Sequence, residues 1–179
     1  MLSDYWRETM ARKRFQPPLR VAAVLVWIPP QGGVPLIATH VPRKADPLVD
    51  YSETTPTGPA ESPFEFDEAM SAVINDQLSV RSGIVTRLGY TSIQKGKRYQ
   101  WYLVICRCES RFEPDPSEIY QLIWHCPQTL PQAVEFMSDG RCEMFLSALA
   151  EAVELKPQLL AAYERPAALL KQGQIRIAA

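Results

Sequence analysis

The sequence predicts an α/β sandwich, in which helices cover both faces of a mixed β-sheet. The continuous aliphatic run at 20–28 (RVAAVLVWI) has the composition of a central strand that is buried on both faces. An amphipathic helix at 64–78 stands between strands, and a second helix at 142–155 follows the last strand. Strands on both sides of one helix, closed by another helix, are typical of a sheet between two helical layers.

The remaining strands follow from short apolar runs bounded by turn residues. They are expected at 34–41, 84–93, 98–108 and 119–126. Gly96 in the sequence QKGK predicts a hairpin between the two middle ones. The segment from Pro42 to Pro63 is rich in Pro, Thr, Ser and Asp, and we expect a long exposed loop there.

The length of 179 residues fits one domain with terminal extensions. We expect a helical N-terminal extension at 1–19, the domain at 20–156, and a C-terminal tail at 157–179. Pro157 and Pro166 are predicted to divide that tail into a short helix and a frayed end.

Composition favours a soluble globular protein, with 46% hydrophobic and 22% charged residues. A net charge of −1 gives no general reason to expect nucleic-acid or membrane binding. No apolar run approaches the ~18 residues of a membrane span, and the first residues lack a signal-peptide core. The cytoplasm is therefore the expected compartment, and no membrane partner is expected.

Cysteines and histidines give little indication of a catalytic site. Cys106 and Cys108 point to the same face of a predicted strand and are interpreted as reduced, mostly buried thiols. His125 beside Cys126 leaves a metal cluster as an alternative, although the spacing is not that of a paired-cysteine zinc site. Neither His125 nor His40 stands beside a Ser or Cys in a nucleophile motif, so Ser-His and Cys-His catalysis has no support.

The order of these elements, with a Pro-x-Gly loop leading into the helix, resembles the Nudix hydrolases. With Gly58 as the first glycine of their loop–helix signature, Ala69, Ile74 and Val80 fall on its small and aliphatic positions. Trp124 resembles the tryptophan that often precedes the last helix in these proteins. The resemblance implies an α/β/α sandwich with a Nudix-like fold, and an enzyme that cleaves nucleoside diphosphates linked to another group.

Most charged positions of that signature are replaced. The loop glutamate falls on Phe64, the Arg-Glu pair on Ala72 and Val73, and the paired glutamates on Asp76 and Gln77. In the family these carboxylates hold Mg²⁺ or Mn²⁺, which neutralises the pyrophosphate and generates the attacking hydroxide. Because Mg²⁺ keeps its water unless several charged oxygens compete, a lone Asp76 binds it only weakly. We therefore expect no metal cofactor and name no catalytic residue.

An alternative hypothesis relocates the metal site to acids on or just before the helix. The candidates are Glu61, Glu65, Glu68 and Asp76. Glu68 and Asp76, eight residues apart, share one helix face. The protein would then be a divergent Nudix hydrolase that uses Mg²⁺ or Mn²⁺. In the simpler interpretation, acids near a helix N-terminus complement its dipole.

Basic and aromatic residues provide the ligand-binding candidates. They are Arg43, Lys44, Lys95, Lys97, Arg98 and Trp101. Phosphate capture and base stacking use these residue types, whereas solvated surface charges are the simpler reading. The basic segment from Arg7 to Arg20 carries too few charges to indicate RNA binding by itself.

The leading hypothesis is a Nudix-fold protein that lacks the usual metal-dependent pyrophosphohydrolase activity. Its expected partner is a nucleotide-like small molecule or another protein, with RNA as a weaker alternative. A homodimer is a further expectation from the resemblance. Besides the divergent hydrolase, an unrelated α/β domain with a chance match to the signature remains a third hypothesis.

Overall fold

A computed structural model describes residues 17–43, 52–80, 83–107 and 112–171. Within these ranges one mixed sheet has the strand order β4-β5-β1-β2-β6, and β3 pairs with part of β1. The strands are β1 (Leu19–Ile28), β2 (Leu36–Pro42), β3 (Thr57–Ala60), β4 (Gly83–Gln94), β5 (Lys97–Arg107) and β6 (Ile119–His125). β1 and β5 run parallel and the other pairs are antiparallel, which confirms the predicted mixed sheet. The predicted N-terminal helix lies outside the described residues.

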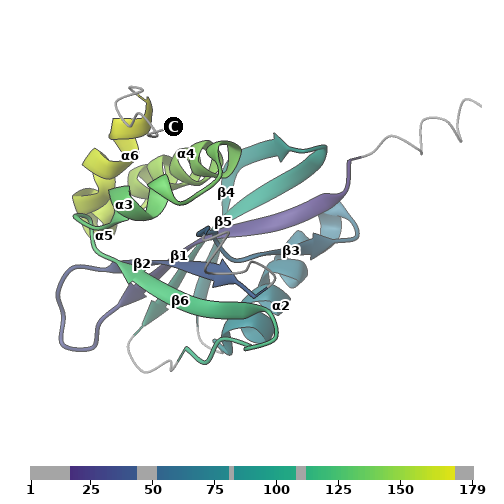
Figure 1. The fold of residues 1–179 in the computed structure, drawn as a ribbon, viewed down its shortest axis with the longest axis horizontal. Helices are drawn as coiled ribbons and strands as arrows, with labels where there is room; N and C mark the ends of the chain where they lie inside the picture. The colour runs from purple at the N-terminus through teal and green to yellow at the C-terminus, as the bar shows by residue number, and fades with distance from the viewer. Residues whose placement is uncertain (1–16, 44–51, 81–82, 108–111, 172–179) are drawn as a thin grey trace, which may run out of the picture.

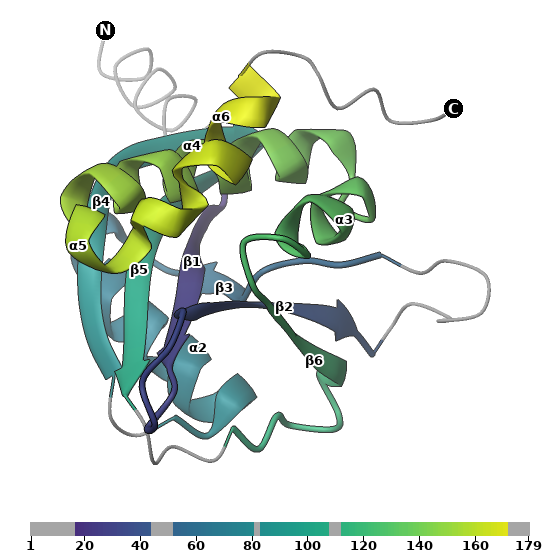
Figure 2. The ribbon, with the colours of Figure 1, turned by 90° about the vertical axis from the view of Figure 1, so that its left-hand side faces the viewer.

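Helices cover both faces of this sheet, as Figures 1 and 2 show. They are η1 (Pro63–Glu65), α2 (Phe66–Leu78), α3 (Leu130–Glu135), α4 (Asp139–Leu155), α5 (Pro157–Leu160), η2 (Ala161–Tyr163) and α6 (Glu164–Lys171). α2 packs on one face, and α4 packs on the other with the remaining C-terminal helices around it. Alternate residues of β1 enter the two cores: Ala22 and Val24 face α4, whereas Val21 and Ala23 face α2. The fully buried central strand and the α/β sandwich are thus confirmed.

The hairpin between β4 and β5 turns at Lys95 and Gly96. Both residues have positive φ, 48° and 70°, as a two-residue turn of type I′ requires. This confirms the hairpin predicted from the sequence QKGK.

β4 contains a bulge between Arg87 and Thr91, where it shifts register against β5. The carboxylate of Glu151, from α4, accepts the backbone N–H groups of Gly89 and Tyr90 at 2.6 and 2.7 Å. A helix side chain therefore fixes the irregular part of this edge strand.

Several predictions about the connections are wrong. The segment expected as an exposed loop contains β3, and Glu53 and Thr54 before it are buried. This strand has no apolar periodicity of its own, because it is held by pairing with β1. Pro166 lies inside the first turn of α6, where a missing N–H costs no helical hydrogen bond. α4 begins at Asp139 rather than at Cys142, and α3 was not predicted.

The C-terminal helices pack back onto α4 rather than extending away from it. The hydroxyl of Tyr163, in η2, donates to the carbonyls of Pro35 and His125 and ties this segment to the sheet. In the ranges given above, no helix combines the length and the apolar character needed to cross a bilayer.

Candidate functional site

A gap opens along one edge of β1, where its pairing partner changes. Leu19–Ala22 pair with β3, whereas Leu25–Trp27 pair with β2. Between these stretches, the N–H of Ala23 donates to the carbonyl of Pro56 at 3.1 Å. The chain just before β3 therefore enters the gap and brings its threonine side chains to the sheet.

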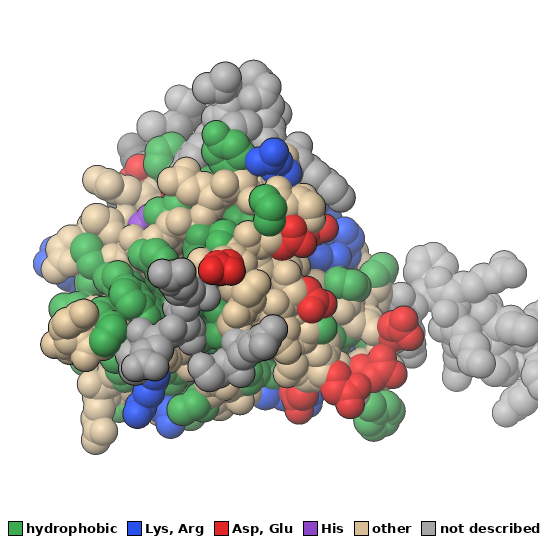
Figure 3. Space-filling model, turned by 90° about the horizontal axis from the view of Figure 1, so that it is seen from below, with side chains coloured by type: hydrophobic (Ala, Val, Ile, Leu, Met, Phe, Trp, Pro, Cys, Tyr) green, Lys and Arg blue, Asp and Glu red, His purple; other side chains and the backbone are tan. Residues whose placement is uncertain are grey.

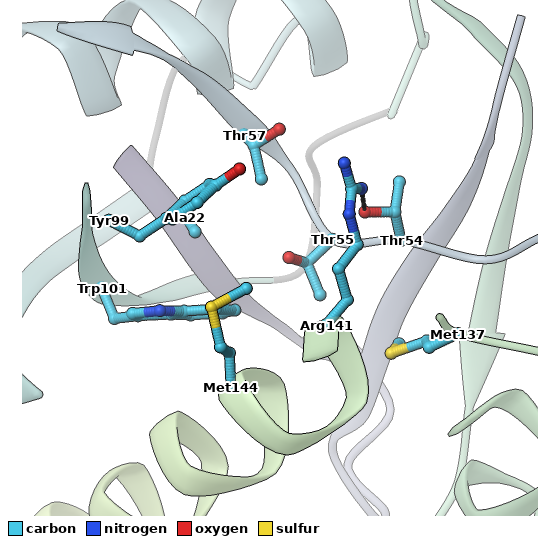
Figure 4. A pocket seen from close by; sticks show the side chains of 9 residues that line it. All are labelled: Ala22, Thr54, Thr55, Thr57, Tyr99, Trp101, Met137, Arg141 and Met144. Atoms are coloured by element: carbon cyan, nitrogen blue, oxygen red, sulfur yellow. Dashed lines mark hydrogen bonds between the residues drawn. The ribbon is translucent and has the colours of Figure 1, made fainter. Parts of the chain in front are cut away.

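A hollow lies at this gap, between the sheet and the first turns of α4 (Figure 4). It is lined by Ala22, Thr54, Thr55, Thr57, Tyr99, Trp101, Met137, Arg141 and Met144. Tyr99 and Trp101 come from β5, and Figure 4 shows Arg141 and Met144 projecting from α4. The cavity volume of about 10 Å³ holds no more than one water molecule, so a larger ligand requires side-chain movement.

Arg141 is the charged residue of this hollow. Its guanidinium donates to the hydroxyl of Thr54, while the backbone of Thr54 exchanges two hydrogen bonds with that of His40, at 2.8 and 2.9 Å. His40 is 6% exposed, and its Nδ1 has no hydrogen-bond partner. Burial, together with the positive charge of Arg141, lowers the pKa of His40 to about 4. His40 is therefore neutral at pH 7.

A buried polar cluster lies beside Thr54 in the sequence and on β2 and β6. The carboxylate of Glu53 accepts from the hydroxyl of Thr39 and lies 3.0 Å from Nε2 of His125. Thr39 also lies 2.9 Å from that same nitrogen. In a nucleophile–His–acid triad, the nucleophile and the acid contact different ring nitrogens of the histidine. Here the Thr39 hydroxyl and the Glu53 carboxylate both contact Nε2 of His125, so the cluster does not have the geometry of a triad. It is a compact buried network that sequence reasoning missed.

The signature positions of α2 attach this helix to β3. Val73 is 6% exposed, and its methyl group fills the space that a Cβ at Gly58 would occupy. The amide of Gln77 donates to the carbonyl of Thr57 at 2.9 Å. Phe64, at the loop-glutamate position, is 96% exposed and packs on no core. The aliphatic and amide replacements at 73 and 77 thus serve helix packing.

The candidate acids lie on the surface of the same helix and the turn before it. Glu61, Glu65, Glu68 and Asp76 are all exposed, and Figure 3 shows acidic side chains gathered on one side of this face. Glu68 and Asp76 are ~12 Å apart along the helix axis, too far to ligate one ion together. Within the described ranges, no three His, Cys, Asp or Glu residues are placed to hold a metal ion.

Asp67, in the first turn of α2, has a structural contact instead. Its carboxylate accepts from the hydroxyl of Tyr102 at 2.6 Å and pairs with Arg87 at 3.1 Å. Arg87 also donates to the Tyr102 hydroxyl and stacks over the ring of Phe66. Burial and the hydrogen bond to Asp67 raise the pKa of Tyr102 to about 12. This network fastens the start of α2 to β4 and β5.

The basic candidates do not converge on one place. Lys95, Lys97 and Arg98 are exposed around the β4–β5 hairpin, and Arg43 stacks on Tyr120 at the end of β2. Lys44 lies outside the described residues. Among the candidates, only Trp101 lines the hollow.

Arg141 was not predicted as a ligand-binding residue. The one available signal was the single basic side chain of this helix, which stands at its start.

The cysteines provide no metal or disulfide site among the described residues. Cys106 is a buried free thiol, Cys142 is buried, and Cys126 is partly exposed. Burial raises the pKa of Cys106 to about 11, as expected for an inert thiol. Cys108 lies outside the described ranges.

Similarity to solved structures indicates which fold this is. An Ap4A hydrolase from C. elegans, solved as a binary complex, matches with a TM-score of 0.53 at 12% identity, over 74% of this chain and 98% of that one. A Nudix-family hydrolase from Clostridium perfringens matches with a TM-score of 0.52 at 12% identity, over 74% and 96%. The chain has a Nudix-like fold. A Nudix hydrolase from M. smegmatis matches with a TM-score of 0.52 at 11% identity, over 79% and 86%. The sequence itself matches no family model and no curated protein.

The residues at the Nudix metal positions do not fit a divalent ion. Phenylalanine, alanine and valine at 64, 72 and 73 have no donor atoms, and Gln77 contributes its amide to Thr57. Asp76 remains as one exposed carboxylate, whereas Mg²⁺ requires several oxygen ligands in octahedral geometry. Metal-activated water therefore has no place in the chemistry assigned to these residues.

Proposed function

We propose that this Nudix-like domain binds a nucleotide-like ligand at the hollow beside α4, and that it does not carry out metal-dependent pyrophosphate hydrolysis. The observation that carries the proposal is the packing of Val73 and Gln77 on β3. Two positions that would carry metal-binding carboxylates are used to hold the helix. Restoring carboxylates there would cost the contacts on which α2 depends.

The lining of the hollow supports a nucleotide-like ligand. Tyr99 and Trp101 provide aromatic rings, three threonines provide hydroxyls, and Arg141 provides a positive charge. Aromatic faces stack on bases, and guanidinium groups bind phosphate oxygens. Met137 and Met144 narrow the hollow, and their flexible side chains are suited to move aside for a planar group.

The test combines binding and turnover on the purified protein. Thermal unfolding is followed with ADP, ATP, ADP-ribose and diadenosine tetraphosphate, each with Mg²⁺ and with EDTA. Product release is measured by chromatography of the same mixtures. We expect at least one nucleotide to raise the unfolding temperature in EDTA, because a ligand that binds only the folded state stabilises it, and we expect no turnover.

Two outcomes would contradict this function. Metal-dependent turnover above ~1 s⁻¹, an ordinary enzyme rate, that disappears when Glu65 and Glu68 are changed to Gln would establish the relocated metal site instead. Absence of any shift with every nucleotide would favour a domain that binds a protein partner.

A further inference from the structure

We infer that Arg141 supplies the positive charge for the phosphate of the ligand, so that this chain binds nucleoside phosphates without a metal ion. The inference rests on the proposed function and adds the group that recognises the anion. It assigns to one guanidinium, on the α4 side of the sheet, the neutralising role that a divalent ion has in Nudix enzymes.

The charge of Arg141 is not balanced by a carboxylate in the described part of the chain. The ion pairs found there join Arg87 to Asp67 and His125 to Glu53. Arg141 is half-buried and stands in the first turn of α4, a 17-residue helix. The N-terminal end of a helix dipole is itself positive, so a cation is unfavourable there and an anion is favourable. An incoming phosphate would satisfy both charges.

The surroundings of Arg141 leave hydrogen-bonding capacity for such a group. The guanidinium has five N–H donors, and among the described residues the Thr54 hydroxyl accepts from it. Thr55 and Thr57 bring further hydroxyls to the same hollow. Glu53, the nearby acid in sequence, is engaged by Thr39 and His125.

The ligand class follows from the chemistry of these groups. A guanidinium can bind two phosphate oxygens with parallel hydrogen bonds and needs no metal ion to do so. Tyr99 and Trp101 line the same small hollow, so the aromatic and charged parts of the ligand must be joined closely. A nucleoside mono- or diphosphate meets both conditions.

The experiment measures ADP and adenosine affinity by titration calorimetry in EDTA. Arg141→Gln keeps a polar side chain without the charge. Arg141→Lys keeps the charge without the planar guanidinium that forms paired hydrogen bonds. Arg165→Gln, at an exposed position of α6, is the matched control. We expect Arg141→Gln to weaken ADP binding at least tenfold, Arg141→Lys to lie between, and Arg165→Gln to have no effect. Adenosine affinity should be the same in all four proteins. The unfolding temperature of each variant verifies that it is folded.

Each other result has a distinct meaning. Equal ADP affinity for wild type and Arg141→Gln would overturn the inference and leave the proposed function intact. ADP binding that requires Mg²⁺ would overturn the metal-free site. Failure of ADP to bind the wild-type protein would overturn the inference, and failure of ATP, ADP-ribose and diadenosine tetraphosphate to bind as well would overturn the proposed function.

Discussion

On the α2 face of the sheet, Asp67, Arg87 and Tyr102 bind one another, whereas on the α4 face Arg141 meets the hydroxyl of Thr54 and no described carboxylate. The first set is closed, because acid, base and phenol satisfy each other. The second leaves N–H donors of a guanidinium unused at a hollow.

This difference indicates where a ligand site can remain in a Nudix-like fold whose helix α2 lacks the family's metal-binding carboxylates. Polar residues near α2 contribute to attachment of the helix, so their removal should affect stability. Near α4, the Arg141 guanidinium has N–H donors beyond the one that Thr54 accepts, as is expected where a ligand completes the contacts.

The largest effect on stability is expected for Val73→Glu, which restores on α2 a carboxylate of the Nudix signature. Val73 is buried against Gly58, so an unpaired charge there should lower the free energy of unfolding by about 3–5 kcal/mol. Ala72→Glu changes the exposed neighbour and should shift it by no more than about 0.5 kcal/mol. Urea denaturation measures both, and equal losses would show that position 73 is not a packing position.

An intermediate effect is expected from His40 as pH changes. Its pKa is about 4 in the folded protein, whereas the ordinary histidine pKa of 6.5 applies to the unfolded chain, so between these values the unfolded chain binds the proton more strongly. Stability should therefore fall as pH is lowered, by about 2 kcal/mol between pH 7 and pH 5 from this residue. His40→Gln should remove that part of the pH dependence. The free energy of unfolding of variant and wild type is measured by urea denaturation at each pH. If it changes with pH to the same extent in both proteins, His40 is not the source of this pH dependence.

The smallest effect is expected within the α2 network. Tyr102→Phe removes the hydroxyl that donates to Asp67 and accepts from Arg87, and should cost about 1 kcal/mol. Asp67 and Arg87 stay partly exposed, so water replaces the lost contacts. Tyr120→Phe, on the exposed face of β6, serves as the control with no expected change. Chemical denaturation measures the free energy of unfolding of the wild type and both variants. Equal stability of all three proteins would contradict a role of Tyr102 in attaching α2 to the sheet.

Residues whose environment is local were predictable from sequence. The stripe of Phe66, Met70, Val73, Ile74 and Leu78 is buried as the helical period indicates. Gly96 predicted the hairpin because a two-residue turn requires positive φ. In both cases neighbours in sequence determine the structure.

The hollow was not predictable in the same way. It combines Ala22, the threonines before and at the start of β3, two residues of β5 and three from the region of α4, which are separated in sequence. β3 itself exists because β1 accepts it as a partner, and its residues TGPA have no strand periodicity. Trp101 was singled out for its aromatic ring, but its position opposite Arg141 depends on how the sheet and α4 pack.

The bulge of β4 bears on edge-to-edge aggregation between molecules of this protein. β4 lies at an open margin of the sheet and carries Ile84 and Ile93, both largely exposed. A long, regular edge strand with such side chains would pair with the edge strands of other molecules and lead to aggregation. Glu151 engages two consecutive amide groups in the middle of β4, and thereby divides the strand into two short pieces that a neighbouring molecule cannot pair with continuously.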